Sequence, residues 1–252
     1  MAILTVGKTR FDAGLVVFDK DGTLLHFEAM WGSLLAHAVQ ALTSGSEGGN
    51  ATAADLYAAL GCDPERGWID PYGPWAMATT EQGLTILAAT LYRRGQPWHV
   101  AEAAVRAAWR AATAPETLPG LVHPTADLVA LFTALQQAGI RIAVDTTDGR
   151  VATETALRLL KVDELVDRVI CGDDDLPGKP EPERLLTTCH ALGVPIERTA
   201  MVGDTVFDLL MGRRAGAGLV AGVLTGASDR ATLAAQADVV LDSVAGIRVA
   251  EN

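Results

Sequence analysis

The stretch LVVFDKDGTLL, residues 15–25, constrains the fold of this chain more than any other part of it. Its four apolar residues, Leu15 to Phe18, are typical of a short strand that is buried on both faces. The acidic residues that follow must lie where this strand ends, because burying an unpaired carboxylate is costly. Open α/β sheets bind ligands beyond the carboxyl ends of their strands. The stretch therefore predicts an α/β fold with Asp19 and Asp21 at a ligand-binding edge of a sheet.

The chemistry of these two carboxylates leaves several roles open. Asp19 can serve as a metal ligand, as a nucleophile toward phosphorus, or as both. Asp21 can give and take protons if its neighbours set its pKa suitably. Gly22 allows the chain to turn sharply after them.

The composition indicates a soluble protein whose main partner is neither nucleic acid nor an anionic membrane. The 252 residues include 20 basic and 31 acidic ones, and the net charge is -11. No run of apolar residues is long enough to span a membrane, and the N-terminus is unlike a signal peptide. The three cysteines are far apart and form no CxxC pair, which favours a reducing compartment. We expect a cytoplasmic protein.

Residues 28–115 have a different pattern from the rest of the chain. Apolar residues recur there at helical spacing, which predicts four helices. Their expected ranges are Ala29–Thr43, Thr52–Leu60, Glu81–Arg94 and Pro97–Thr113. We interpret this block as an inserted helical domain.

After residue 119 strands and helices alternate, as parallel βαβ units do. Expected strands are Ile140–Val144, Val169–Cys171, Thr199–Val202, Leu219–Leu224 and, as the last one, Asp238–Leu241. Residues 1–14 are expected to add an edge strand at Ile3–Val6 or to form a loose arm.

Polar residues also follow two of these strands. Thr146 and Thr147 come after Ile140–Val144, where a hydroxyl and backbone N–H groups suit a phosphate oxyanion. The alternation of a strand directs Asp145 away from Thr146, toward backbone or other polar groups. Asp204 ends the strand Thr199–Val202, and Asp208 lies four residues later in a helix, so both can face one ion.

A single lysine stands between prolines in the segment Pro177–Pro182, PGKPEP. The prolines stiffen the backbone around Lys179. A fixed ammonium can offset the charge of a nucleophilic carboxylate and of a phosphoryl group.

Together, DKDGT at residues 19–23, the Thr146 strand end, GKP at residues 178–180 and GDTVFD at residues 203–208 resemble the four motifs of the haloacid dehalogenase (HAD) superfamily. Thr147 departs from the usual Asn, and Asp145 stands where an apolar residue is typical. The resemblance implies a Rossmann-like parallel-sheet core, residues 1–27 and 116–252. It also implies that residues 28–115 form a type 1 α-helical cap. FDKDGTL and the closing DVVLDSV look like phosphoglycolate-phosphatase-type hydrolases of this superfamily.

The resemblance also implies roles for individual residues. Asp19 is the expected nucleophile, Asp21 the acid and base, and Thr146 and Lys179 bind the phosphoryl group together with Thr147. Mg²⁺ is expected on Asp19, Asp204, Asp208 and the backbone carbonyl of Asp21. For the substrate's other end, the cap residues Arg66 and Arg93 are candidates.

The expected activity is Mg²⁺-dependent hydrolysis of a small-molecule phosphate monoester through an aspartyl-phosphate, by a monomer or homodimer. A phosphomutase similar to beta-phosphoglucomutase is the alternative, because mutases share the four motifs and the cap. A HAD protein that binds a phosphorylated ligand without turnover is a further alternative. The sequence does not identify the substrate.

Overall fold

The computed structural model describes residues 2–44, 50–114 and 117–250. The chain divides into two compact units, one made of Met1–Phe27 with Val122–Asn252 and the other of Glu28–Leu121. The boundary expected at residues 115 and 116 lies outside the described residues.

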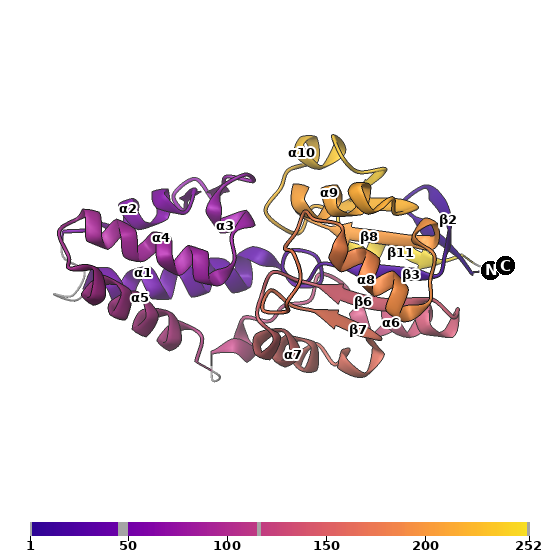
Figure 1. The fold of residues 1–252 in the computed structure, drawn as a ribbon, viewed down its shortest axis with the longest axis horizontal. Helices are drawn as coiled ribbons and strands as arrows, with labels where there is room; N and C mark the ends of the chain where they lie inside the picture. Colours follow the sequence, from indigo (N-terminus) through magenta and orange to yellow (C-terminus); the bar gives the residue numbers. More distant parts are fainter. Residues whose placement is uncertain (1, 45–49, 115–116, 251–252) are drawn as a thin grey trace. The chain divides into compact units, whose positions relative to one another are not determined.

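The first unit is built on a six-stranded parallel sheet, which confirms the predicted α/β class (Figure 1). The strand order is β10-β9-β8-β3-β6-β7. At the centre, Phe18 is in register with Val144 of β6 and Val202 of β8, so these three strands end at one edge. The strands are β3 (Leu15–Phe18), β6 (Arg141–Asp145), β7 (Arg168–Ile170), β8 (Thr199–Gly203), β9 (Leu219–Val223) and β10 (Val239–Leu241).

Helices cover both faces of this sheet. Leu15 and Val17 of β3 pack in one apolar cluster with α8 and α9. The next residue, Phe18, points to the opposite face and stacks on Phe132 of α6, with 5.3 Å between ring centroids. The helices of this unit are α6 (Leu128–Gln137), α7 (Arg150–Leu159), α8 (Glu183–Leu192), α9 (Val206–Ala215) and α10 (Arg230–Ala234).

The two ends of the chain form a second, antiparallel sheet in this unit. Its strand order is β11-β1-β2, with β1 at Ala2–Val6, β2 at Thr9–Ala13 and β11 at Ile247–Val249. Leu4 pairs with Val249, and Figure 1 shows both termini beside each other. The expectation that Asp238–Leu241 is the last strand is therefore wrong. The strand expected at Ile3–Val6 is confirmed as β1, but it is the middle strand of this second sheet and not an edge strand, and residues 1–14 are not a loose arm. The strands β2 and β11 were not predicted, because five and three residues of mixed polarity carry too little periodicity.

The second unit is mainly helical. It contains a π-helical turn (Glu28–Gly32), α1 (Ser33–Ser44), α2 (Ala53–Ala59), α3 (Pro74–Met77), α4 (Thr80–Arg93), α5 (Trp98–Ala112) and a short pair of strands, β4 (Cys62–Asp63) and β5 (Trp68–Ile69). Thr52 caps α2 and forms a capping box with Asp55. One α-helix is expected at Ala29–Thr43. In the structure Glu28–Gly32 is π-helical, and the α-helix α1 begins at Ser33.

No described helix has both the length and the apolar character needed to cross a bilayer. The three cysteines are free thiols; Cys62 is half-buried, and Cys171 and Cys189 are buried.

Candidate active site

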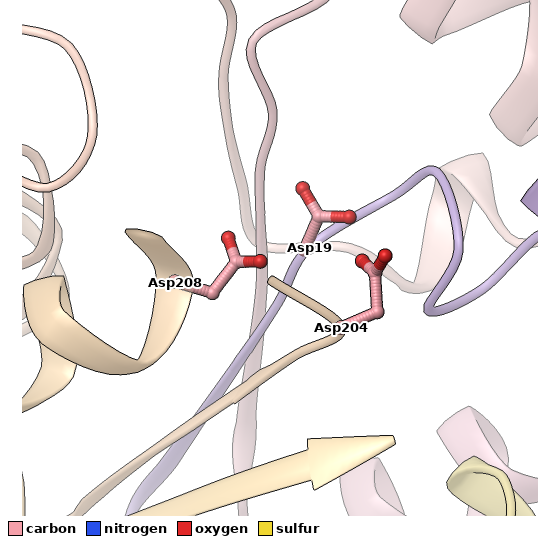
Figure 2. Close-up of side chains that lie close together, drawn as sticks. All are labelled: Asp19, Asp204 and Asp208. Atoms are coloured by element: carbon pink, nitrogen blue, oxygen red, sulfur yellow. The ribbon is translucent and has the colours of Figure 1, made fainter. Parts of the chain in front are cut away.

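Three carboxylates from separate parts of the first unit converge at the carboxyl edge of the sheet. Asp19 follows β3, Asp204 follows β8, and Asp208 lies in the first turn of α9. One oxygen of each lies within 4.8 Å of the other two, and Figure 2 shows the carboxyl groups gathered together. Their exposed fractions are only 7%, 0% and 1%. Buried oxygen donors this close together could hold a metal ion.

The local structure explains this convergence. Because β3 and β8 are parallel and in register, Asp19 and Asp204 leave the sheet at the same edge. The backbone N–H of Asp19 donates to the carbonyl of Val202, 2.9 Å away, and extends this pairing. Asp208 is fixed by a capping box with Thr205, whose N–H and hydroxyl donate to Oδ2 at 3.0 and 2.6 Å. Its Oδ1 atom is left for other partners.

Asp204 lies in a tight backbone cradle. Its Oδ2 accepts the N–H of Ala227 at 3.0 Å, and its Oδ1 accepts the hydroxyl of Thr23 at 3.3 Å. Gly22 adopts a φ of +86°, and a Cβ there would lie 2.4 Å from Oδ2 of Asp204. At Gly226 a Cβ would lie 1.8 Å from the same oxygen. Both glycines are needed for the backbone to approach this carboxylate closely.

Lys179 links two of the three carboxylates. Its Nζ donates to Oδ1 of Asp19 at 2.6 Å, to Oδ1 of Asp208 at 2.7 Å and to the backbone carbonyl of Asp145 at 2.8 Å. These bonds use all three N–H groups of the ammonium. Although burial alone would lower the pKa of Lys179, the neighbouring Asp19, Asp208 and Asp145 raise it above its ordinary value, so the side chain is a cation.

The charges of this cluster fit a divalent cation. Three carboxylates face the single ammonium of Lys179, which leaves two negative charges uncompensated among these four side chains. Burial, followed by the charge of Asp208, raises the pKa of Asp204 to about 7. Burial also raises the pKa of Asp19, although Lys179 opposes that shift. A divalent ion held by Asp19, Asp204 and Asp208 would offset these charges.

Asp21 and the loop after β6 are joined by a buried lysine. Lys20 has no exposed surface, and its Nζ lies 2.7 Å from Oδ2 of Asp21 and 2.9 Å from Oδ2 of Asp148. The backbone N–H of Asp148 in turn donates to the hydroxyl of Thr146 at 3.1 Å. The expected proton donor and the expected phosphate-binding threonine therefore belong to one hydrogen-bonded network. Thr147 is the next residue of this loop and is half-buried.

A family model described as haloacid dehalogenase-like hydrolase matches residues 14–216. The chain belongs to this family. The match covers most of the chain and includes the three clustered carboxylates and Lys179.

Curated relatives of this HAD-family chain include phosphatases. A phosphoglycolate phosphatase of Agrobacterium fabrum is 31% identical over 52% of this chain and 55% of its own length. The pyrophosphatase PpaX of Halalkalibacterium halodurans is 36% identical over 38% of this chain and 45% of its own length. The chain thus spans about half the length of these relatives.

The fold is also shared with solved structures. A candidate beta-phosphoglucomutase of Thermotoga maritima superposes with a TM-score of 0.66 at 20% identity, covering 90% of this chain and 93% of its own. A likeness at this level of identity shows the fold of the HAD core and not an activity.

Sequence reasoning missed the partner of Asp145, which is Arg184 in α8. Nε of Arg184 donates to both carboxylate oxygens of Asp145 at 3.0 and 3.2 Å, and its Nη2 donates to the carbonyl of Thr146 at 2.8 Å. Arg184 is 1% exposed. An acidic residue at the end of a buried strand was the one signal that a buried cation had to be near. The same reasoning missed the pairing of Lys20 with Asp148.

Arg66 and Arg93 belong to the second unit, whereas the three carboxylates belong to the first. Arg66 stands in the turn between β4 and β5, where its side chain is 82% exposed and 3.5 Å from Asp63. Arg93 is an exposed residue in the last turn of α4.

Proposed function

We propose that this HAD-family protein is a Mg²⁺-dependent phosphatase that hydrolyses a small-molecule phosphate monoester through a covalent intermediate on Asp19. The observation that carries the proposal is the contact of Lys179 with Asp19. A buried ammonium 2.6 Å from a carboxylate at a strand end can orient a nucleophile and neutralise a phosphoryl group at once. Asp204 and Asp208 complete a set of oxygen donors beside it.

In the proposed reaction a carboxylate oxygen of Asp19 attacks phosphorus, and the bond from phosphorus to the leaving alcohol breaks. Asp21 gives a proton to the leaving oxygen. Asp21 then takes a proton from water, whose oxygen attacks the aspartyl-phosphate. The bond between phosphorus and Asp19 breaks, releasing inorganic phosphate and restoring both residues.

The other residues bind and orient. Thr146 and the amides around Thr147 hold a phosphoryl oxygen, and Lys179 holds Asp19 against it. Asp19, Asp204 and Asp208, with the backbone carbonyl of Asp21, would hold Mg²⁺. When bound, the ion offsets negative charge on the phosphoryl oxygens.

We propose the second unit as a type 1 cap that selects the leaving group, with Arg66 and Arg93 binding a carboxylate or second phosphate. The phosphoglycolate phosphatase among the relatives supports a small acidic ester as the first substrate to try. The three free thiols support a reducing compartment such as the cytoplasm.

A phosphomutase is the second candidate. It would use the same attack by Asp19 and then return the phosphoryl group to another hydroxyl of the sugar instead of to water. A candidate beta-phosphoglucomutase shares the fold, which is compatible with this reading.

The test is release of inorganic phosphate from a panel that includes phosphoglycolate and sugar monophosphates, with Mg²⁺ or with EDTA. Asp19→Asn should abolish Mg²⁺-dependent release. Asp242→Asn is the matched control, because the Asp242 side chain is 93% exposed. Sugar-phosphate isomerisation that needs a bisphosphate activator would identify the mutase. Tight binding of esters with neither reaction would identify a non-catalytic binder.

A further inference from the structure

Arg184 occupies a position that helix stability does not explain. It is the second residue of α8, and a cation in the first turn of a helix opposes the helix dipole. Its side chain is also buried, at 2% exposure. Replacing a buried ion pair by apolar side chains is often neutral or stabilising, so the pair with Asp145 is not explained by stability either.

Arg184 contacts Asp145, one of the three residues that hold Lys179. Its guanidinium donates to the carboxylate of Asp145, the last residue of β6, and to the carbonyl of Thr146, the residue that follows. The backbone carbonyl of Asp145 is one of the three acceptors of the Lys179 ammonium.

The side chain of Asp145 also competes for that ammonium. Its Oδ1 atom lies 3.9 Å from Nζ of Lys179, a little beyond hydrogen-bond distance. Asp19 and Asp208 hold the same Nζ at 2.6 and 2.7 Å. A shift of Nζ toward Asp145 would therefore bring this third carboxylate within hydrogen-bond distance. Without a second cation, the buried carboxylate of Asp145 would attract Lys179 strongly.

We propose that Arg184 is a positioning residue that occupies the Asp145 carboxylate and thereby keeps the Lys179 ammonium on Asp19. This inference rests on the proposed function, in which Asp19 is the nucleophile. Arg184 acts through Asp145 and Lys179 and contacts no reacting atom.

The test is a double-mutant cycle of Arg184→Met and Asp145→Asn. Arg184→Met leaves the Asp145 carboxylate free to draw Lys179 away, and kcat should fall at least about tenfold with a smaller change in KM. Adding Asp145→Asn removes the competing charge, and kcat should recover most of that loss. All values are normalised to the folded fraction from circular dichroism. A purely structural role predicts that kcat per folded molecule is unchanged in Arg184→Met, or that Asp145→Asn does not restore it, and either result overturns the proposal.

Two further measurements keep the result decisive. If Arg184→Met does not fold, Arg184→Gln keeps hydrogen-bond donors but removes the charge, and the same loss of kcat and rescue by Asp145→Asn are expected. The crystal structure of the variant should place Nζ of Lys179 within hydrogen-bond distance of the Asp145 carboxylate and away from Asp19. An unmoved Lys179 refutes the inference. If the wild type is inactive on every ester while Lys179 moves as expected, the proposed function fails, and only the role of Arg184 in placing Lys179 stands.

Discussion

With EDTA present, this protein should become less stable as the pH rises from about 4 to about 7. The carboxyl group of Asp204 has an ordinary pKa of 3.8, and burial raises it to about 7 in the folded chain. Between these values the folded protein holds a proton that the unfolded chain has lost. The stabilisation from this proton is full below pH 3.8 and is lost as pH rises through about 7. At ~1.4 kcal/mol for each pH unit, the total is roughly 4 kcal/mol.

Urea unfolding in EDTA between pH 5 and pH 8 measures this effect. Relative to Asp204→Asn, the wild type should lose about 3 kcal/mol of unfolding free energy across that range. Asp19 contributes in the same direction, because burial raises its pKa too. The exposed control Asp242→Asn should follow the wild type.

Mg²⁺ should offset most of this loss of stability, because the ion and the proton compete for the same carboxylates. At a concentration of 100 times its dissociation constant, the ion should add ~2.7 kcal/mol at pH 8 and much less at pH 5. The reasoning is refuted if Asp204→Asn has the same slope as the wild type in EDTA, or if Mg²⁺ stabilises the protein equally at both pH values.

Three other substitutions or modifications test separate parts of the structure. Lys20→Met removes the buried ammonium that binds Asp21 and Asp148, and urea unfolding should show a loss of ~3–5 kcal/mol; a loss below about 1 kcal/mol would contradict the pairing. Gly226→Ala places a Cβ 1.8 Å from an Asp204 oxygen and should abolish stabilisation by Mg²⁺ in thermal melts. The control Gly83→Ala, with nothing within 4 Å of the added Cβ in α4, should instead raise stability by ~1 kcal/mol. Burial raises the pKa of Cys62 to about 12, so iodoacetamide at pH 8 should alkylate it at least about tenfold more slowly in native protein than in urea, as measured by peptide mapping.

Much of the core could be predicted because its signals are strong and local. Leu15–Phe18 is a strand with the expected bounds, and its acidic neighbour marks where it must end. α4 was expected at Glu81–Arg94 and is observed at Thr80–Arg93, since its apolar spacing is regular. Polar residues that follow parallel strands meet at one edge of the sheet, and the structure brings Asp19, Asp204 and Asp208 together there, with Lys179 from the loop before α8.

What could not be predicted depends on contacts between residues far apart in the chain. The pairing of β1 with β11 joins the two ends of the sequence, and no local pattern indicates it. Lys20 and Asp148 are 128 residues apart. Arg184 has the sequence context of a solvated helix residue, and only the fold shows that it is buried against Asp145. The placement of Arg66 and Arg93 as substrate ligands stays a prediction.

The pattern of partners around the buried acids gives an independent reason for a cation site at Asp204. Lys179 binds Asp19 and Asp208, and Arg184 binds Asp145. The hydrogen bonds of the Asp204 side chain come instead from neutral donors, the hydroxyl of Thr23 and the N–H of Ala227. A fully buried carboxylate whose hydrogen bonds come from neutral donors favours keeping a proton or binding a cation, and here the nearby charge of Lys179 opposes the pKa rise only in part. The raised pKa of Asp204 is the first of these outcomes, and a bound divalent ion would be the second.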